Sequence, residues 1–174
     1  MIEGNRIEYI WKPADRRHFH TGRNGATVQT IVLHSTCGTL LGDIETLTVG
    51  EREVSSHWYV TKTGEIYHFV ADSDTAYHAG VVSDPSFDNA HSIGIEQEHL
   101  DGQEDWPDIQ VHATAAICCA LDYVLKTVLA IKHHSQIAAP AGRKVDPVNF
   151  PSDVFWDAYI GFQHPWEFVC KASE

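Results

Sequence analysis

The sequence predicts a single-domain α/β protein with a central mixed β-sheet flanked by α-helices. Short β-branched or alternating runs occupy the first hundred residues, one of them carries a hairpin signal, and a long run with helical spacing follows residue 108. A chain of 174 residues is long enough to bury one core. Because we find no internal repeat or convincing linker, we expect one domain over residues 1–174, with its core at about 23–162.

Three segments predict the strands. The run Thr30–Leu33 reads as a buried strand that ends at His34. Residues 55–70 contain two strand-like runs around the turn 62–64, which is typical of a hairpin. In the third segment, 91–100, side chains alternate between two faces. One face carries Ile93 and Ile95, and the other carries Gly94 and Glu96.

Helices are predicted in three places. Residues 42–51 form a short helix with Asp43 as the candidate N-cap. A long amphipathic helix is expected over 108–131, and a last helix over 152–162. The apolar positions that predict the long helix are Ile117, Leu121, Val124, Leu125, Val128 and Ile131. The tail 163–174 is either an ordered extension or the start of a linker.

Charge and composition restrict the partners. Twelve Lys and Arg residues against 24 Asp and Glu residues give a net charge of −12, which argues against nucleic acid or anionic lipid as a steady partner. The most apolar window, 113–131, contains Asp122 and Lys126 and reads as a core helix, so we expect no membrane span. The start lacks the pattern of a secretory signal, and the four cysteines form no spaced framework. We therefore expect synthesis in a cytoplasm, with reduced cysteines.

Three separated side chains suggest a metal site. Hydrolytic zinc sites use three protein ligands and leave one position for water. His34 stands at a strand end, His134 follows the long helical run, and Asp146 closes a loop rich in Pro, Ala and Gly. Lys144 lies two residues before Asp146, so both face the same side in an extended segment. Each histidine taken alone is better explained as an ordinary core or surface residue, and it is the combination that favours zinc.

Five motifs follow one another in an order that resembles the type 2 N-acetylmuramoyl-L-alanine amidases, a group of bacterial and phage enzymes whose fold the peptidoglycan recognition proteins share. They are "TIVLHST", "SSHWYVTKTGEIYHFV", "TAYHAG", "HSIGIEQE" and "HHSQIAAPAGRKVDP", and they span roughly residues 23–150. The resemblance implies zinc-dependent hydrolysis of the amide bond between N-acetylmuramic acid and L-alanine of the peptidoglycan stem peptide.

The resemblance also implies roles for individual residues. The implied zinc ligands are His34, His134 and Asp146. Glu96 matches the catalytic base and Lys144 the lysine that stabilises the oxyanion. The implied substrate-binding residues are His78, Ser56 and His57.

The sequence departs from the family pattern at three points. The loop "IAAPAGRK" is longer than usual, and Ser56 stands where some members have a tyrosine. His133 precedes His134 and stays an alternative ligand, as does Cys37, three residues after His34.

The implied partner is peptidoglycan or its muropeptides, and we expect a monomer. A compact chain without a signal resembles the catalytic domain of a phage or prophage endolysin, made in the cytoplasm and acting on the bacterial wall after release. A cytoplasmic wall-recycling amidase is the first alternative. A non-catalytic peptidoglycan-binding module of the same fold and a zinc peptidase that cuts within the stem peptide are the others.

Overall fold

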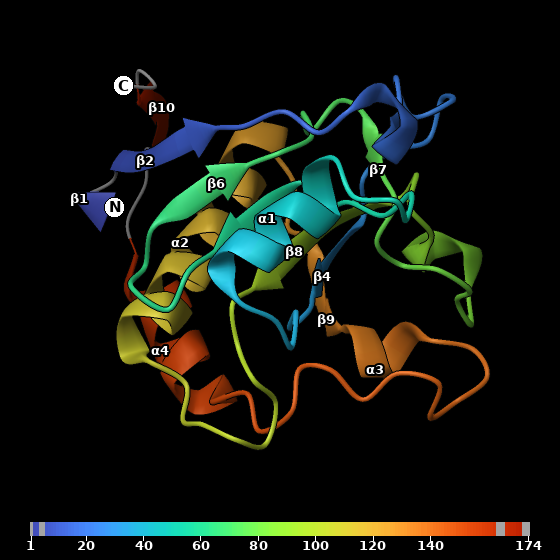
Figure 1. Cartoon of the computed structure of the whole chain (residues 1–174). Helices are drawn as coiled ribbons and strands as arrows, with labels where there is room; N and C mark the ends of the chain where they lie inside the picture. The colour runs from blue at the N-terminus through green and yellow to red at the C-terminus, as the bar shows by residue number, and fades with distance from the viewer. Residues whose placement is uncertain (1, 4–5, 163–165, 172–174) are drawn as a thin grey trace.

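A mixed β-sheet forms the centre of the protein (Figure 1). The structure, a computed structural model, describes residues 2–3, 6–162 and 166–171. Within these residues the strands follow the order β1-β2-β6-β5-β8-β4-β9, and β10 also pairs with β2. The bounds are β1 Ile2–Glu3, β2 Arg6–Trp11, β4 Thr30–Leu33, β5 Trp58–Val60, β6 Ile66–His68, β8 Ser92–Gln97, β9 Ala130–His133 and β10 Glu167–Lys171. Two short strands, β3 (Phe19–His20) and β7 (Thr75–Ala76), form a separate pair.

The two faces of the sheet are covered by different helices. The helices are α1 Leu40–Thr48, α2 Asp108–Leu125, α3 His134–Ile137 and α4 Ser152–Gly161, with short 3₁₀ turns η1 (Arg16–His18) and η2 (Pro85–Phe87). Residues of α2 and α4 pack in one core cluster with Ile31, Leu33 and Ile95 of the sheet. Residues of α1 pack in a second cluster with Tyr59 of β5. The predicted fold class is confirmed.

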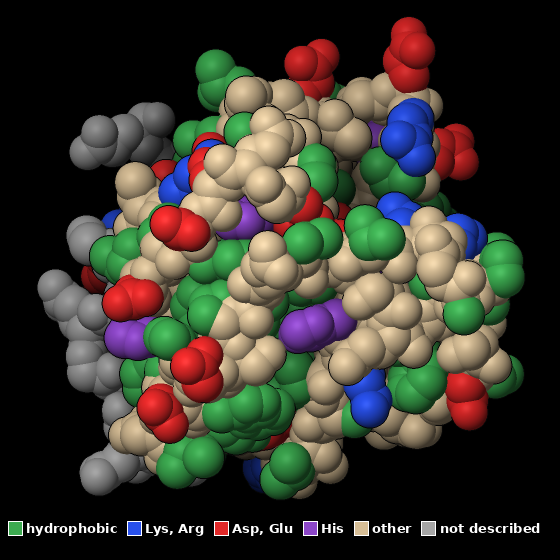
Figure 2. Space-filling view, turned by 90° about the horizontal axis from the view of Figure 1, so that it is seen from below, with side chains coloured by type: hydrophobic (Ala, Val, Ile, Leu, Met, Phe, Trp, Pro, Cys, Tyr) green, Lys and Arg blue, Asp and Glu red, His purple; other side chains and the backbone are tan. Residues whose placement is uncertain are grey.

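The described chain contains no helix that combines the length and the apolar character needed to cross a bilayer. On the face seen in Figure 2, acidic side chains are scattered and gather in no single patch.

The predicted strands and the last helix are confirmed. Thr30–Leu33 is buried throughout, and β5 and β6 pair antiparallel as the hairpin signal indicated. Along β8, Ile93 and Ile95 point into the main core, which leaves Gly94 and Glu96 on the opposite face. That second face carries the polar residues of the candidate site.

The predicted long helix over 108–131 is wrong at its C-terminal end. Helix α2 ends at Leu125, and Lys126 adopts the left-handed conformation with φ of 55°. The chain then enters β9, which runs parallel to β4. Val128, expected on the apolar helix face, is 85% exposed.

Hydrogen bonds to one aspartate explain this early helix end. The backbone oxygen of Asp122 accepts from the N–H of Thr127, and its side-chain Oδ1 accepts from the N–H of Leu129. A short apolar run fits a strand as well as a helix, so the free edge of β4 decides between them.

Asp43 is not the N-cap of α1, contrary to the prediction. The helix begins earlier, after Thr39, and Asp43 lies inside its first turn. Its Oδ2 accepts hydrogen bonds from the Thr36 hydroxyl (2.6 Å) and the Tyr59 hydroxyl (2.9 Å). These partners hold the carboxylate in a buried position facing the sheet.

The sheet contains strands that lie before and after residues 23–162, the range predicted for the core. Strand β2, which we did not predict, pairs with β6, and β10 pairs in parallel with β2. Ile7 and Trp166 are both buried in the main core. Residues 167–171 of the tail are therefore an ordered extension, whereas 163–165 and 172–174 lie outside the described residues.

Candidate active site

The site forms where parallel strands end together. In the register of the sheet, Leu33 of β4 pairs with Ile95 of β8 and with His133 of β9. The next residues, His34, Glu96 and His134, therefore come to one level although they are far apart in the sequence. The carboxyl ends of parallel strands are the usual place for ligand sites in open α/β sheets.

Three side-chain atoms converge at this point. The Nδ1 atoms of His34 and His134 lie 2.9 Å apart. Oδ2 of Asp146 lies 3.0 Å from Nδ1 of His134 and 3.6 Å from Nδ1 of His34. All three residues are at least nine-tenths buried.

This triangle fits one face of a zinc coordination tetrahedron. Zinc binds imidazole nitrogen and carboxylate oxygen at about 2.0–2.2 Å, which places neighbouring ligand atoms about 3.3–3.6 Å apart in a tetrahedron. Of the observed separations, 3.6 Å lies in that range, and 2.9 and 3.0 Å are a few tenths of an ångström shorter. Two imidazole nitrogens and a carboxylate oxygen packed so closely are mutually repulsive acceptors unless a proton or a cation lies between them.

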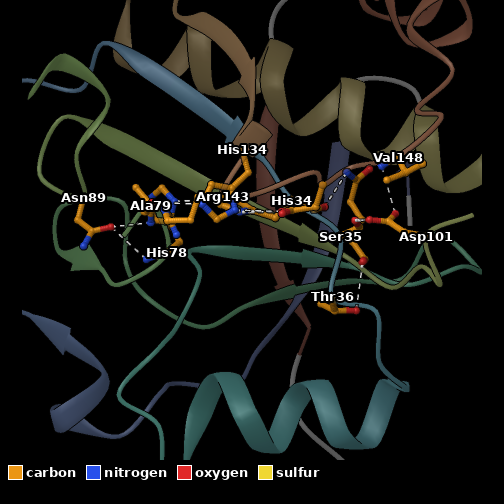
Figure 3. A network of polar contacts seen from close by, with 12 residues as sticks. His34, Ser35, Thr36, His78, Ala79, Asn89, Asp101, His134, Arg143 and Val148 are labelled. Atoms are coloured by element: carbon orange, nitrogen blue, oxygen red, sulfur yellow. Dashed lines mark hydrogen bonds and ion pairs between the residues drawn. The ribbon is translucent and has the colours of Figure 1, made fainter. Parts of the chain in front are cut away.

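The opposite ring nitrogens of both histidines are held by hydrogen bonds (Figure 3). Nε2 of His134 lies 3.1 Å from the backbone oxygen of Ala79. A carbonyl only accepts, so Nε2 carries a hydrogen and the ring turns its other nitrogen, Nδ1, to the cluster. Nε2 of His34 lies 3.0 Å from Nδ1 of His78. Such outer hydrogen bonds orient metal-binding histidines in general.

Ionisation favours the form that binds a cation. Burial lowers the pKa of His34 to about 4, so this ring is neutral at neutral pH. Burial by itself raises the pKa of Asp146, but the hydrogen bonds with His134 and His34 outweigh it and hold that pKa well below its ordinary value. Metal binding requires a neutral imidazole and an ionised carboxylate.

A cavity of about 190 Å³ opens beside the cluster. The sequence-predicted residues that line it are His78, Glu96, His134, Lys144 and Asp146. The others are Ser35, Thr36, Asp43, Thr46, Leu47, Arg52, Val54, Ser55 and Tyr77.

Glu96 is the carboxylate of this cavity that lacks a partner. Its Oε2 is buried and accepts no hydrogen bond from the described residues. Burial raises the pKa of Glu96 to about 8, and the negative charges of Asp146 and Asp43 add to this shift. A carboxyl group with a pKa near neutrality is suited to accept and return a proton.

Ser56 and His57 are not brought to the cavity. Both are fully buried, and it is the neighbouring Ser55 that lines the cavity. Nδ1 of His57 accepts from the Gly94 N–H (3.0 Å), and its Nε2 lies 2.9 Å from a guanidinium nitrogen of Arg23. Substrate binding by Ser56 and His57 stays a prediction that their burial does not support.

The alternative ligands lie elsewhere. His133 packs against Phe150, with a ring separation of 5.4 Å. Cys37 is exposed and is not part of the cluster.

Sequence reasoning missed several polar residues around the site. Asp101 accepts from the hydroxyl of Ser35 (2.6 Å) and from the N–H of Val148 (3.2 Å), and so ties the end of β4 to the loop after Asp146. Asn89 contacts the backbone of residues 78–79. Neither residue lies in a recognisable motif, and only the folded chain brings them to their partners.

Comparison with known proteins identifies the family of the chain. The sequence model of the N-acetylmuramoyl-L-alanine amidase family matches residues 24–149. A search of curated protein sequences gave no match.

Solved structures share the fold. The selenomethionine derivative of AmpD is 23% identical, with a TM-score of 0.73 over 91% of this chain and 98% of that one. AmpDh3 of Pseudomonas aeruginosa, in complex with anhydromuramic pentapeptide, is 27% identical, with a TM-score of 0.65 over 75% of this chain and 59% of that one. The endolysin amidase LysCS of Clostridium intestinale is 19% identical, with a TM-score of 0.65 over 91% of this chain and 96% of that one. Because the family model covers most of the sequence, this chain belongs to the N-acetylmuramoyl-L-alanine amidase family.

Proposed function

We propose that this chain is a zinc-dependent amidase that cuts the bond between N-acetylmuramic acid and the L-alanine of the peptidoglycan stem peptide. The observation that carries the proposal is the convergence of His34, His134 and Asp146 at the edge of a polar cavity. A zinc ion held by these three residues would lower the pKa of a bound water to about 7 and so supply hydroxide at neutral pH.

Glu96 is the proton carrier in this proposal. Its buried Oε2 has no competing partner among the described residues, so it is free to accept the proton of the attacking water. The same group then returns the proton to the leaving nitrogen of L-alanine. A cation at the ligand cluster favours the ionised form of Glu96, because it offsets the charge of Asp146 that raises the Glu96 pKa.

Lys144 stabilises the negative charge of the tetrahedral intermediate. It lines the same cavity as Glu96 and Asp146, and its ammonium group can donate a hydrogen bond to the oxyanion. Removing a well-placed donor of this kind costs about 3–4 kcal/mol in other hydrolases.

Digestion of defined muropeptides by zinc-loaded and metal-stripped protein tests the proposal. We expect mass spectrometry to find an intact stem peptide with a free L-alanine amine, only when zinc is present. Cleavage within the peptide would indicate a peptidase instead. Binding of muropeptides without any cleavage, in protein shown to contain zinc, would indicate a binding module.

The size of the substrate separates two biological settings. We propose an endolysin-type enzyme that acts on intact wall as a monomer, and the structural likeness to LysCS supports this setting. The likeness to AmpDh3, which was solved with anhydromuramic pentapeptide, favours a recycling amidase as the second candidate. Comparing turnover of purified walls with turnover of soluble anhydro-muropeptides distinguishes the two.

A further inference from the structure

Two adjacent residues contact both ligand histidines from behind. Nδ1 of His78 faces Nε2 of His34, and the backbone oxygen of Ala79 faces Nε2 of His134. The direction in which each histidine presents Nδ1 to the cluster therefore depends on where the backbone of residues 78–79 lies.

The tautomer of His78 follows from its other partners. The Ser92 hydroxyl donates to the backbone oxygen of Asp88 (2.6 Å), so its oxygen is left to accept from Nε2 of His78 (3.3 Å). Nδ1 of His78 then accepts from Nε2 of His34. A Cβ on Gly94 would lie 2.5 Å from Cγ of the His78 ring, so the ring fills the space that this glycine leaves.

Asn89 holds the backbone of both residues. Its Oδ1 accepts from the N–H of His78 (3.0 Å) and from the N–H of Ala79 (2.8 Å) (Figure 3). Asn89 is itself anchored, because the buried guanidinium of Arg23 donates to the backbone oxygens of Asn89 (3.4 Å) and Ala90 (2.8 Å). On the other side of the segment, Arg143 donates to the backbone oxygen of Val81 (2.7 Å).

We propose that Asn89 is a positioning residue for the metal centre, which aims both ligand histidines through its two hydrogen bonds to the backbone of His78 and Ala79. The inference rests on the proposed zinc site. Asn89 is absent from the cavity of about 190 Å³ that Glu96 and Asp146 line, although it lines a neighbouring cavity of about 250 Å³ with His78 and His134. Its link to the ligand histidines is the backbone of residues 78–79, to which both of its Oδ1 hydrogen bonds go.

The test compares zinc binding by three variants of the full chain. Asn89→Ala removes the acceptor, and we expect a zinc Kd about 10–100-fold weaker, the usual effect of losing an outer partner. Asn89→Asp keeps an oxygen at the same reach, and we expect it to retain wild-type affinity. Asp84→Ala is the matched control, because Asp84 accepts from the Ser86 N–H in the same loop and, within the described part of the chain, makes no hydrogen bond to residues 78–79. Affinity is measured by competition with a chromophoric chelator.

Two further readouts separate positioning from folding. The visible spectrum of the cobalt-substituted protein reports coordination geometry, and we expect it to change in Asn89→Ala alone. A purely structural role would lower the melting temperature of the metal-free variant and leave its zinc Kd and cobalt spectrum at wild-type values, which would overturn the inference. An Asn89→Asp variant that is folded but binds zinc as weakly as Asn89→Ala would overturn it too.

The outcomes also separate this inference from the proposed function. If Asn89→Ala does not fold, Asn89→Ser, whose side chain is too short to reach both N–H groups, carries the same expectations. A wild-type protein that binds no zinc contradicts the zinc amidase itself. A wild-type protein that binds zinc no better than a folded Asn89→Ala contradicts only the role of Asn89.

Discussion

At the scale of single residues, Glu96 combines a buried carboxylate oxygen with the absence of a hydrogen-bond donor among the described residues. A buried carboxylate without a partner is costly, and proteins tolerate such groups mostly where function requires them. The neighbouring strand residue Gln97, by contrast, donates to the His34 backbone oxygen and accepts from Thr114. The difference supports our proposal that Glu96 serves the chemistry, whereas Gln97 joins neighbouring segments of the structure.

Glu96→Gln removes the proposed proton carrier and keeps the side-chain shape. We expect turnover of muropeptides to fall by about 10²–10⁴-fold, the usual contribution of general acid–base catalysis, with zinc content unchanged. Glu98→Gln is the control, because Glu98 lies in the same segment but accepts from the Lys62 N–H and does not line the cavity. Wild-type turnover by Glu96→Gln would remove Glu96 from the mechanism.

The raised pKa of Glu96 also predicts how the metal-free protein responds to pH. The folded state keeps this carboxyl protonated up to a pH of about 8, whereas the unfolded chain ionises it near 4.5. The stability that Glu96 contributes is thus complete below pH 4.5 and is lost as the pH rises through 8. Glutamine cannot ionise.

We therefore expect metal-free Glu96→Gln to melt clearly above metal-free wild type at pH 8 and at the same temperature at pH 4.5. Thermal melts followed by circular dichroism across this range check it. An equal difference at both pH values would show that packing, and not ionisation, separates the two proteins.

At the scale of secondary-structure elements, the end of α2 determines where His134 lies. Helix α2 stops at Leu125, the turn leads into β9, and α3 begins at His134 directly after that strand. Had the helix continued to residue 131, β9 could not pair with β4, and His134 would not lie beside His34. The left-handed residue Lys126 is the point where the direction changes.

Lys126→Gly should stabilise the protein. Lys126 has φ of 55° and ψ of 37°, a conformation that costs a residue with a Cβ about 1 kcal/mol more than glycine. We expect the melting temperature to rise by about 2–4 °C and zinc affinity to stay unchanged. Lys126→Ala keeps the Cβ and serves as the control. A rise of the same size in the alanine variant would mean that the lysine side chain, and not the backbone, is responsible.

At the scale of the whole molecule, a metal ion would join segments that are distant in the sequence. His34 follows β4, His134 follows β9, and Asp146 lies in the loop before α4. A ligand that binds only the folded state stabilises it by mass action, by about 4 kcal/mol at a thousandfold excess over Kd.

We therefore expect zinc to raise the melting temperature of the wild type by several degrees and chelation to reverse this. Asp146→Ala removes one ligand, so we expect lower zinc content by elemental analysis and little or no shift on adding zinc. Unchanged zinc content in this variant would refute Asp146 as a ligand.

The sequence by itself determined the fold class, the strands around the site and the family, because these depend on local patterns and on motifs in a fixed order. Thr30–Leu33 is a short β-branched and apolar run without polar alternation, and the strand is buried on both faces. The alternation along β8 separates Ile93 from Glu96. Both strands can therefore be predicted from the sequence. His34, His134 and Asp146 could be chosen from their motifs.

Only the tertiary structure decided what depends on partners distant in the chain. Residues 130–131 become part of a strand because β4 offers them an edge, and β2 joins the sheet along β6 while β10 joins along β2. Asp43 is a buried acceptor for Tyr59 rather than a helix cap. The ring nitrogens that face the cluster, and the role we assign to Asn89, depend on hydrogen bonds between loops whose meeting no local pattern encodes.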